Sequence, residues 1–243
     1  MKLAIDIGNT SVTCGLFKNA ALIKRFNIQS LNQINNYIDN QLFTDIDKII
    51  ISSVVPSLTN DYINFFKKIT IDNIQLINYK SGNLSLQVPY PKTVGTDRIC
   101  NIFATLKLYN SPAIIVDFGT ATTYDVINSK NEFIGGAIGA GIETSANYLI
   151  NSAALLDKTD LQFPNKAIGV DTKENIQSGI MFGAIDQVEG MIKRIIEEKN
   201  NKYTIILTGG LSKLLSPKLS INHILDMDLT LKGIFYIDEL ENV

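Results

Sequence analysis

Two stretches of the chain repeat one order of apolar and polar positions. Residues 3–8 read Leu-Ala-Ile-Asp-Ile-Gly and residues 114–119 read Ile-Ile-Val-Asp-Phe-Gly, so each apolar run ends in Asp-x-Gly. Further apolar runs, separated by polar turns, predict a second and a third strand in each half, at 12–17, 21–26, 122–127 and 133–138. Short polar turns between such runs are typical of β-hairpins. The pattern therefore predicts two three-stranded meanders, one in each half of the chain.

Downstream of each meander, an apolar run predicts a buried strand that ends in small or polar residues. These strands are expected at 48–52 and 204–208, and they end in Ser52-Ser53 and Thr208-Gly209-Gly210. A helical segment precedes each of them, so both halves have the order strand, strand, strand, helix, strand. Two matching halves are improbable by chance. They predict an internal duplication, with domains at 1–111 and 112–243.

Two further segments carry apolar residues at helical spacing. The stripes predict one helix over 98–109 and a longer one over 173–198. Asp171-Thr172-Lys173-Glu174 is typical of a capping box at the start of the longer helix. Gly179 and Gly183 lower the helix propensity there, so we expect them to permit close packing.

Composition narrows the class of protein. The 243 residues suffice for two domains, and 45% hydrophobic with 19% charged residues is ordinary for a globular core. The net charge is −2 without a basic cluster, which argues against nucleic-acid binding. No run approaches the roughly 20 apolar residues of a membrane helix, and the chain begins directly with a strand, so we expect a cytoplasmic protein. We interpret Cys14 and Cys100 as buried hydrophobes, with a disulfide left open. We interpret His223 as a structural or surface residue.

The first hairpin is a candidate phosphate site. Gly8 lets the backbone approach a ligand, and the side chains that follow it can donate to phosphate oxygens: Asn9, Thr10, Ser11 and Thr13. Asp6 can orient the magnesium that accompanies ATP, usually through water. The alternative is a turn in which Asp6 and Asn9 only stabilise the backbone.

The second hairpin repeats these features. Thr120, Thr122 and Thr123 offer hydroxyl donors, and Asp117 is a hard ligand suited to a cation. Two such hairpins facing one another would hold a polyphosphate from both sides. The alternative role of Asp117 is again to cap a turn.

A third candidate precedes the predicted helix at 98–109. In Gly95-Thr96-Asp97-Arg98, either Thr96 or Asp97 could be a helix N-cap. A functional reading also accounts for Arg98, whose charge the helix dipole disfavours in the first turn. In that reading Arg98 binds an anionic group and Asp97 accepts a proton from a substrate hydroxyl.

A glycine-rich stretch, Gly135-Gly136-Ala137-Ile138-Gly139-Ala140-Gly141-Ile142, follows the second meander. It matches neither the Walker A motif nor the Rossmann fingerprint. It could bring a nucleotide base close to the backbone, or it could be a tight bend before a helix. Thr208-Gly209-Gly210 is open to the same two interpretations.

The ordered set of these motifs resembles the type III pantothenate kinases, of the acetate-kinase, sugar-kinase, Hsp70 and actin superfamily. The resemblance spans essentially the whole chain, and its remaining motifs are Asp171-Thr172 and Asp228-Leu229-Thr230-Leu231-Lys232-Gly233. It implies an α/β fold of two duplicated ribonuclease H-like (actin-like) domains, each a mixed sheet flanked by helices, with a cleft between them. It implies ATP-dependent phosphorylation of the primary hydroxyl of pantothenate to 4'-phosphopantothenate, the first step of coenzyme A biosynthesis.

The resemblance also implies roles for single residues. ATP would contact Asp6, Ile7, Gly8, Asn9, Thr10, Ser11, Val12, Thr13 and Thr120, and Mg²⁺ would accompany it. Pantothenate would contact Gly95, Thr96, Asp97, Arg98 and Thr172, with Asp97 as the proton acceptor. Asp117 would bind a monovalent cation, K⁺ or NH₄⁺. The resemblance further implies a homodimer, with the helix at 173–198 as an interface element.

This chain departs from the family pattern at three places. Thr96 stands where the family usually has alanine, and Ala140 stands where it generally has proline. Val88 stands where many members have a substrate-contacting tyrosine, and that role is not transferred to the nearby Tyr90.

Two other functions compete with this one. Some relatives of the fold were described as accessory factors for transcription, so the chain could bind nucleotide as a regulator without turnover. Asp97 beside Arg98 favours the enzyme, because a regulator has no need of a base next to an anion binder. The acceptor could also be a sugar or a small carboxylic acid, and only the whole-chain resemblance selects pantothenate.

Overall fold

A computed structural model of the chain describes residues 1–69, 71, 73–152 and 159–241. The chain forms two compact units. Unit 1 comprises Met1–Ser111, Ile127–Gly135 and Asp228–Val243, and unit 2 comprises Pro112–Val126 and Gly136–Met227. The chain thus leaves unit 1 after Ser111 and returns to it twice. The assignment of domains to 1–111 and 112–243 stays a prediction.

Unit 1 is built around a five-stranded sheet with the order β3-β2-β1-β4-β5. Its strands are β1 (Lys2–Ile7), β2 (Val12–Lys18), β3 (Ala21–Ile28), β4 (Lys48–Ser53) and β5 (Ile74–Leu76). The first three pair in antiparallel fashion, whereas β4 is parallel to both β1 and β5. The predicted meander and the predicted strand at 48–52 are therefore confirmed.

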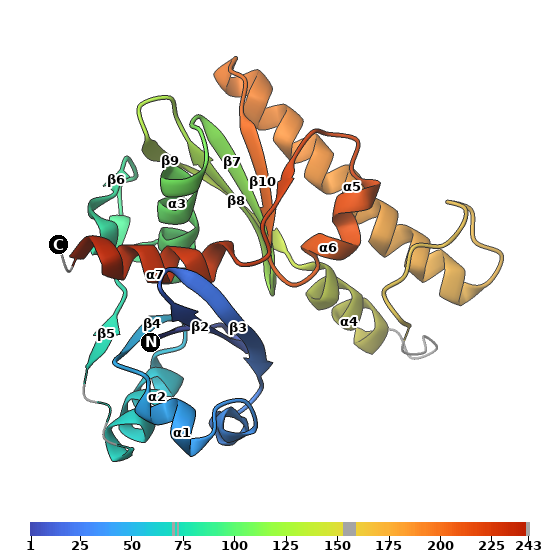
Figure 1. The fold of residues 1–243 in the computed structure, drawn as a ribbon. Helices are drawn as coiled ribbons and strands as arrows, with labels where there is room; N and C mark the ends of the chain where they lie inside the picture. The colour runs from blue at the N-terminus through green and yellow to red at the C-terminus, as the bar shows by residue number, and fades with distance from the viewer. Residues whose placement is uncertain (70, 72, 153–158, 242–243) are drawn as a thin grey trace. The chain divides into compact units, whose positions relative to one another are not determined.

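Helices cover both faces of this sheet (Figure 1). The helices of unit 1 are α1 (Asn40–Thr44), α2 (Pro56–Lys68), α3 (Thr96–Leu108) and α7 (Leu229–Glu241), with 3₁₀ turns at Leu31–Asn36, Ser81–Asn83 and Pro91–Thr93. Leu3, Ile5 and Ile7 belong to a buried cluster that includes Tyr62 and Phe66 of α2. Because side chains alternate along a strand, the residues between them face α7, while α3 packs on β4. Both faces are buried, which is why β1 is almost continuously apolar.

Helix α7 returns from the end of the chain and packs on α3. A Cβ on Gly233 would lie 2.0 Å from the carbonyl oxygen of Cys100, so only glycine fits this crossing. The Thr230 hydroxyl donates to Asn101 Oδ1 over 2.8 Å. Asp238, with 0% of its surface exposed, pairs with Lys2 over 2.6 Å and with Lys48. The Asp228–Gly233 motif thus begins a helix that is packed and charge-paired within unit 1.

Unit 2 repeats the plan of unit 1. Its strands are β7 (Ala113–Phe118), β8 (Ala121–Ile127), β10 (Thr204–Thr208) and β11 (Ile224–Leu225), together with most of β9 (Glu132–Ala140). The strand order is β11-β10-β7-β8-β9, which matches β5-β4-β1-β2-β3 position by position. The first residues of β9 belong to unit 1, where Phe133 pairs with Leu86 of β6 (Ser85–Leu86). The matching orders confirm the predicted duplication.

The helices of unit 2 are α4 (Ile142–Ser152), α5 (Thr172–Lys199) and α6 (Ser212–Leu215), with a 3₁₀ turn at Ser216–Lys218. The start of α5 has the N-cap half of the predicted capping box, whereas the Glu174 side chain reaches back to the residue before the cap. Asp171 Oδ1 accepts from the Glu174 amide over 2.8 Å, and Glu174 Oε2 accepts from the Val170 amide over 3.0 Å. No helix within the described ranges is long and apolar enough to cross a membrane.

The expectation that Gly179 and Gly183 permit close packing is wrong within this chain. A Cβ added at either position would meet no described atom within 4 Å. Both glycines are exposed, so they weaken α5 without bringing another element of unit 2 closer. Gly179 and Gly183 lie on one face of the helix, but the helical period does not predict whether that face is buried.

Candidate active site

The hairpin between β1 and β2 presents an exposed polar tip. Asn9, Thr10 and Ser11 are exposed, and the Gly8 amide donates to the Ser11 carbonyl over 3.1 Å. A Cβ on Gly8 would lie 3.2 Å from that same carbonyl oxygen, so a side chain would strain the turn. The tip offers hydroxyl and amide donors at the surface, which suits the oxygens of a phosphate.

The hairpin between β7 and β8 has the same form in unit 2. Gly119 and Thr120 are exposed, and the Gly119 amide donates to Ala121 over 3.1 Å. The Thr120 carbonyl accepts from the Gly141 amide over 3.0 Å and from the Thr144 hydroxyl over 2.8 Å. This hairpin is therefore braced from behind by the start of α4.

Glycines let two segments of unit 2 approach this second hairpin. A Cβ on Gly141 would lie 2.4 Å from the carbonyl oxygens of Gly119 and Thr120. A Cβ on Gly209, whose φ is +90°, would lie 2.3 Å from Asp117 Oδ1. The glycine-rich stretch is thus mostly strand β9, and Gly141 and Gly209 are needed for close approach to the Asp117–Thr120 turn.

Asp97 lies in the first turn of α3, in unit 1. Its Oδ1 accepts from the Arg98 amide over 2.8 Å and would lie 2.4 Å from a Cβ on Gly95. The carboxylate thus folds back over a position where only glycine leaves room. Burial raises the pKa of Asp97, although the hydrogen bond from the Arg98 amide and the charge of Arg98 oppose this rise. A carboxylate with a raised pKa is a better proton acceptor than an exposed aspartate.

Arg98 is positioned by an aromatic ring distant in sequence. Its Cζ lies 5.5 Å from the centroid of Phe133, which is 2% exposed. The ring is held in turn by the pairing of β6 with β9 and by the Gln87 amide, which donates to the Phe133 carbonyl over 2.8 Å. A cation over an aromatic face is stabilised by about 0.5–1 kcal/mol at an exposed site and by more when desolvated.

Ser52 connects the first hairpin to the start of α3. In the parallel pairing of β1 with β4, Asp6 lies opposite Ser52. Ser52 Oγ is 3.2 Å from Asp6 Oδ1 and 3.0 Å from Thr96 Oγ1, and the Thr96 hydroxyl is 3.0 Å from the Ser53 carbonyl oxygen. Unit 1 thus brings two of the predicted groups together, the phosphate hairpin and the Gly95–Arg98 segment.

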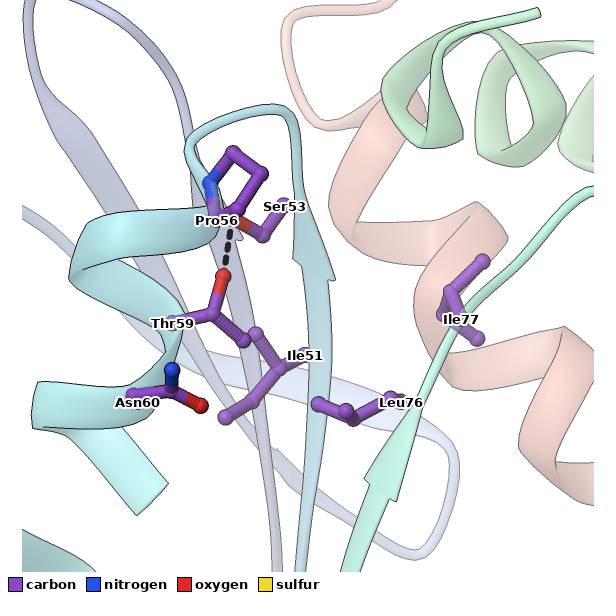
Figure 2. Close-up of a pocket in the computed structure, with 7 residues that line it drawn as sticks. All are labelled: Ile51, Ser53, Pro56, Thr59, Asn60, Leu76 and Ile77. Carbon is purple, nitrogen blue, oxygen red and sulfur yellow. Dashed lines mark hydrogen bonds between the residues drawn. The ribbon is translucent and has the colours of Figure 1, made fainter. Parts of the chain in front are cut away.

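A separate pocket of about 290 Å³ lies between β4, α2 and β5 (Figure 2). Figure 2 shows the Thr59 hydroxyl directed at Ser53 Oγ, a hydrogen bond of 2.7 Å. The lining residues are Ile51, Ser53, Pro56, Thr59, Asn60, Leu76 and Ile77, none of which is charged. The pocket shares Ser53 with the segment that contacts Thr96, but none of the residues predicted to contact ATP or pantothenate lines it.

The other predicted residues lie as follows. Thr172 is the exposed first residue of α5, in unit 2, and its contact with substrate stays a prediction. Cys14 and Cys100 are buried free thiols, as expected, and burial raises the pKa of both. His223 is structural, with Nε2 at 2.7 Å from Ser216 Oγ and Nδ1 at 2.8 Å from the Ile221 carbonyl oxygen.

The sequence matches one known family over most of its length. A family model described as type III pantothenate kinase matches residues 2–194. The chain belongs to the type III pantothenate kinase family. A type III pantothenate kinase from Sulfurihydrogenibium sp. (strain YO3AOP1) is 38% identical over 252 residues, which cover 98% of this chain and 100% of that protein. The predicted family is confirmed, and with it the prediction that the protein is an enzyme.

Solved structures related to this pantothenate kinase family member confirm the fold. A protein from Campylobacter jejuni described as a Baf family transcriptional activator has a TM-score of 0.67 at 21% identity, over 99% of this chain and 100% of its own. A protein from Porphyromonas gingivalis described as an N-acetylglucosamine kinase has a TM-score of 0.51 at 12% identity, over the full length of both chains. At these identities the likeness shows the fold alone. It confirms two duplicated ribonuclease H-like domains, each a mixed sheet flanked by helices.

Two residues of the site were missed by sequence reasoning. The sequence shows Ser52 as a polar residue at the end of a predicted strand, but only the pairing of β1 with β4 puts it opposite Asp6. Phe133 was interpreted as an ordinary strand residue. Its position against Arg98 depends on a contact between segments 35 residues apart, which local patterns do not reveal.

Proposed function

We propose that this member of the type III pantothenate kinase family transfers the γ-phosphoryl group of ATP to the primary hydroxyl of pantothenate, giving 4'-phosphopantothenate. One observation carries the proposal. Asp97, a carboxylate with a raised pKa, lies beside Arg98 and is tied through Thr96 and Ser52 to the Asp6 hairpin. A proton acceptor, an anion binder and a phosphate-binding turn thus occur together in one unit.

The residues have complementary roles in this reaction. The hydroxyl proton of pantothenate passes to the Asp97 carboxylate as the bond between oxygen and phosphorus forms and the bond to the ADP oxygen breaks. Arg98 binds the carboxylate of pantothenate, since a guanidinium matches a carboxylate with two parallel donors. Phosphoryl transfer depends mainly on positioning and charge neutralisation, so few reacting side chains are needed.

Residues Asp6–Thr13 and Thr120 are proposed to bind ATP. The exposed donors at both hairpin tips support this role. Bound Mg²⁺ would neutralise phosphate charge, and the Asp6 carboxylate suits a hydrated ion of this kind. Among the described residues there is no group of three or more His, Cys, Asp or Glu side chains that could hold a metal ion. This fits Mg²⁺ that keeps water and phosphate as most of its ligands.

Asp117 is proposed to bind a monovalent cation, K⁺ or NH₄⁺. Its half-buried carboxylate at the end of β7, with the Gly209 backbone close by, supports this assignment. Carboxylate and carbonyl oxygens are hard ligands suited to such a cation. Gly95, Thr96 and Thr172 are proposed to complete the contacts with pantothenate.

A homodimer is also proposed, with α5 at the interface. Ile168 and Val170, just before α5, are 84% and 89% exposed, and Gly179 and Gly183 leave a flat face on the helix. Exposed apolar side chains beside an exposed helix face favour association. Light scattering after size exclusion would measure the mass, and a single 26.9 kDa species would refute the dimer.

The activity is tested by incubating the purified chain with ATP, Mg²⁺, K⁺ and pantothenate and measuring phosphopantothenate by mass spectrometry. Asp97→Asn is expected to lose about 10²–10⁴-fold in kcat, the usual contribution of a general base. Asp39→Asn is the matched control, because Asp39 caps α1 by accepting from the Leu42 amide and asparagine caps equally well. Absence of product with either K⁺ or NH₄⁺ would refute the proposal.

The same assay separates the competing functions. A panel of sugars and small carboxylic acids tests the acceptor, and faster turnover of one of them would replace pantothenate. A regulator would bind ATP without consuming it in the presence of any acceptor. That alternative is not favoured, because the named relative that covers 98% of the chain is a kinase.

A further inference from the structure

Three oxygen atoms form a chain beneath the first hairpin. Asp6 Oδ1, Ser52 Oγ and Thr96 Oγ1 are separated by 3.2 Å and 3.0 Å in that order. We call these three residues the hydroxyl relay. Ser52 is 0% exposed, so its hydroxyl depends on protein partners. The relay connects the end of β1, the end of β4 and the first residue of α3.

The two hydroxyl groups cannot satisfy every contact at once. Ser52 and Thr96 have one hydroxyl proton each, whereas three contacts between oxygen atoms involve these hydroxyl groups, including the one from Thr96 to the Ser53 carbonyl. In one arrangement Thr96 donates to Ser52, and Ser52 donates to Asp6. In the other, Ser52 donates to Thr96, and Thr96 donates to the Ser53 carbonyl.

The charge on Asp6 selects between these arrangements. An ionised carboxylate is a strong acceptor, and hydrogen bonds to charged groups are stronger than neutral ones. Asp6 therefore draws the Ser52 proton, and Ser52 in turn draws the proton of Thr96. The carboxylate is held in one orientation, and the same contacts fix the first residue of α3, next to Asp97.

We propose that Ser52 and Thr96 are positioning residues that hold Asp6 and the first turn of α3 in a fixed mutual geometry for phosphoryl transfer. This inference rests on the proposed function and adds to it, since neither hydroxyl needs to touch the reacting atoms. Thr96 then acts through its contacts with β4 in addition to any contact with pantothenate. Small displacements of reacting groups reduce rates strongly, so the relay should affect kcat more than the affinity for pantothenate.

The test is a double-mutant cycle on Ser52→Ala and Thr96→Val, read as kcat and as KM for ATP and for pantothenate. Each single variant is expected to lose about tenfold in kcat, with KM for pantothenate changed by less than about threefold. The double variant should lose little more than either single one, because both changes break the same chain of contacts. Thr96→Ser should keep kcat within about threefold, because it retains the hydroxyl.

Thr105→Val is the matched control on the same helix. Thr105 is 1% exposed and its hydroxyl has no hydrogen-bond partner among the described residues, so its replacement should leave kcat unchanged. Losses that simply multiply in the double variant would overturn the relay. So would unchanged kcat in both single variants, or an equal loss in Thr105→Val. Thermal unfolding of each variant shows whether a loss reflects unfolding, and Thr96→Ser decides the case if Thr96→Val does not fold.

Failure of the proposed function would be visible separately, as a wild-type chain that makes no phosphopantothenate. In that case the hydroxyl relay is tested by calorimetric titration, which measures the affinity of the same variants for Mg·ATP alone. A weaker affinity in both single variants, without a further loss in the double variant, supports the relay. Unchanged affinity in the variants, or no binding by the wild type, overturns it.

Discussion

Gly233→Ala is the most direct test of how α7 supports the site. The added Cβ would lie 2.0 Å from the Cys100 carbonyl oxygen, 2.5 Å from its carbon and 2.8 Å from its Cα. All three atoms belong to the backbone of α3, so no side chain can rotate away. Since real Cβ contacts essentially never fall below 3.0 Å, the two helices must separate by about 1 Å.

The cost of this separation can be bounded. Overpacking a tight contact typically costs about 1–3 kcal/mol, occasionally more. The separation also stretches the 2.8 Å hydrogen bond from Thr230 to Asn101, which adds about 1 kcal/mol. Alanine regains about 1 kcal/mol of helix propensity. We therefore expect a net loss of about 1–3 kcal/mol in the free energy of unfolding, or roughly 2–4 °C in melting temperature per kcal/mol.

Chemical denaturation followed by circular dichroism measures this loss, with Gly190→Ala as the matched control. Gly190 also lies inside a helix, but a Cβ there would meet no described atom within 4 Å. Its replacement should stabilise the protein by up to about 1 kcal/mol through helix propensity. Equal stability of Gly233→Ala and wild type, or equal destabilisation by the two variants, would refute the clash.

Three further predictions follow from contacts in unit 1. Burial raises the pKa of Asp97 above its ordinary value of 3.8, so the ionised carboxylate lowers the stability of the folded state once the pH exceeds that value. Asp97→Asn should therefore raise the free energy of unfolding at pH 7, although it abolishes most of kcat. Denaturation at pH 7 and at pH 3 checks the sign, since the gain should shrink at the lower pH. The acid limb of the wild-type kcat/KM profile should lie above the ordinary pKa of an aspartate. Asp238→Asn removes the buried carboxylate that pairs with Lys2 and Lys48 and should cost about 3–5 kcal/mol in chemical denaturation. The loss should persist in 0.5 M salt, because salt screens a buried ion pair much less than an exposed one. Phe133→Leu removes the ring beneath Arg98 and should raise KM for pantothenate about two- to fivefold with kcat retained, as steady-state kinetics would show.

The strands and helices of this chain were predictable because their patterns are local. Strand β10 coincides with its predicted range, and α5 extends one residue beyond its predicted range at each end, because burial on one or two faces imposes a fixed period on the sequence. The hairpins were predictable from turn chemistry. The two Asp-x-Gly motifs also marked the duplication, since the same turn is needed twice.

Long-range contacts were not predictable in the same way. The return of α7 to unit 1 depends on Gly233 meeting Cys100, and nothing local to either residue specifies the other. The exposed face of α5 was misjudged for a related reason. A helical period shows that residues share a face, but whether that face is covered depends on elements elsewhere.

The duplication explains why the hydroxyl relay exists in one unit and has a different counterpart in the other. Asp6 lies opposite Ser52 in the pairing of β1 with β4, and Asp117 lies opposite Thr208 in the pairing of β7 with β10. Both units therefore put a hydroxyl residue beside the hairpin aspartate. They diverge at the next position, where unit 1 has Ser53, whose carbonyl meets Thr96, and unit 2 has Gly209, whose backbone closes on Asp117. In unit 1 the Ser52 hydroxyl links Asp6 to Thr96 of α3, which suits an aspartate that is held in place relative to the proposed proton acceptor. In unit 2 the Gly209 backbone lies close to Asp117, which suits an aspartate proposed to share a cation with carbonyl oxygens. Both units thus carry a hydroxyl residue opposite the hairpin aspartate, and they differ in the element that meets the end of that strand, the first turn of α3 in unit 1 and the Gly209 backbone in unit 2.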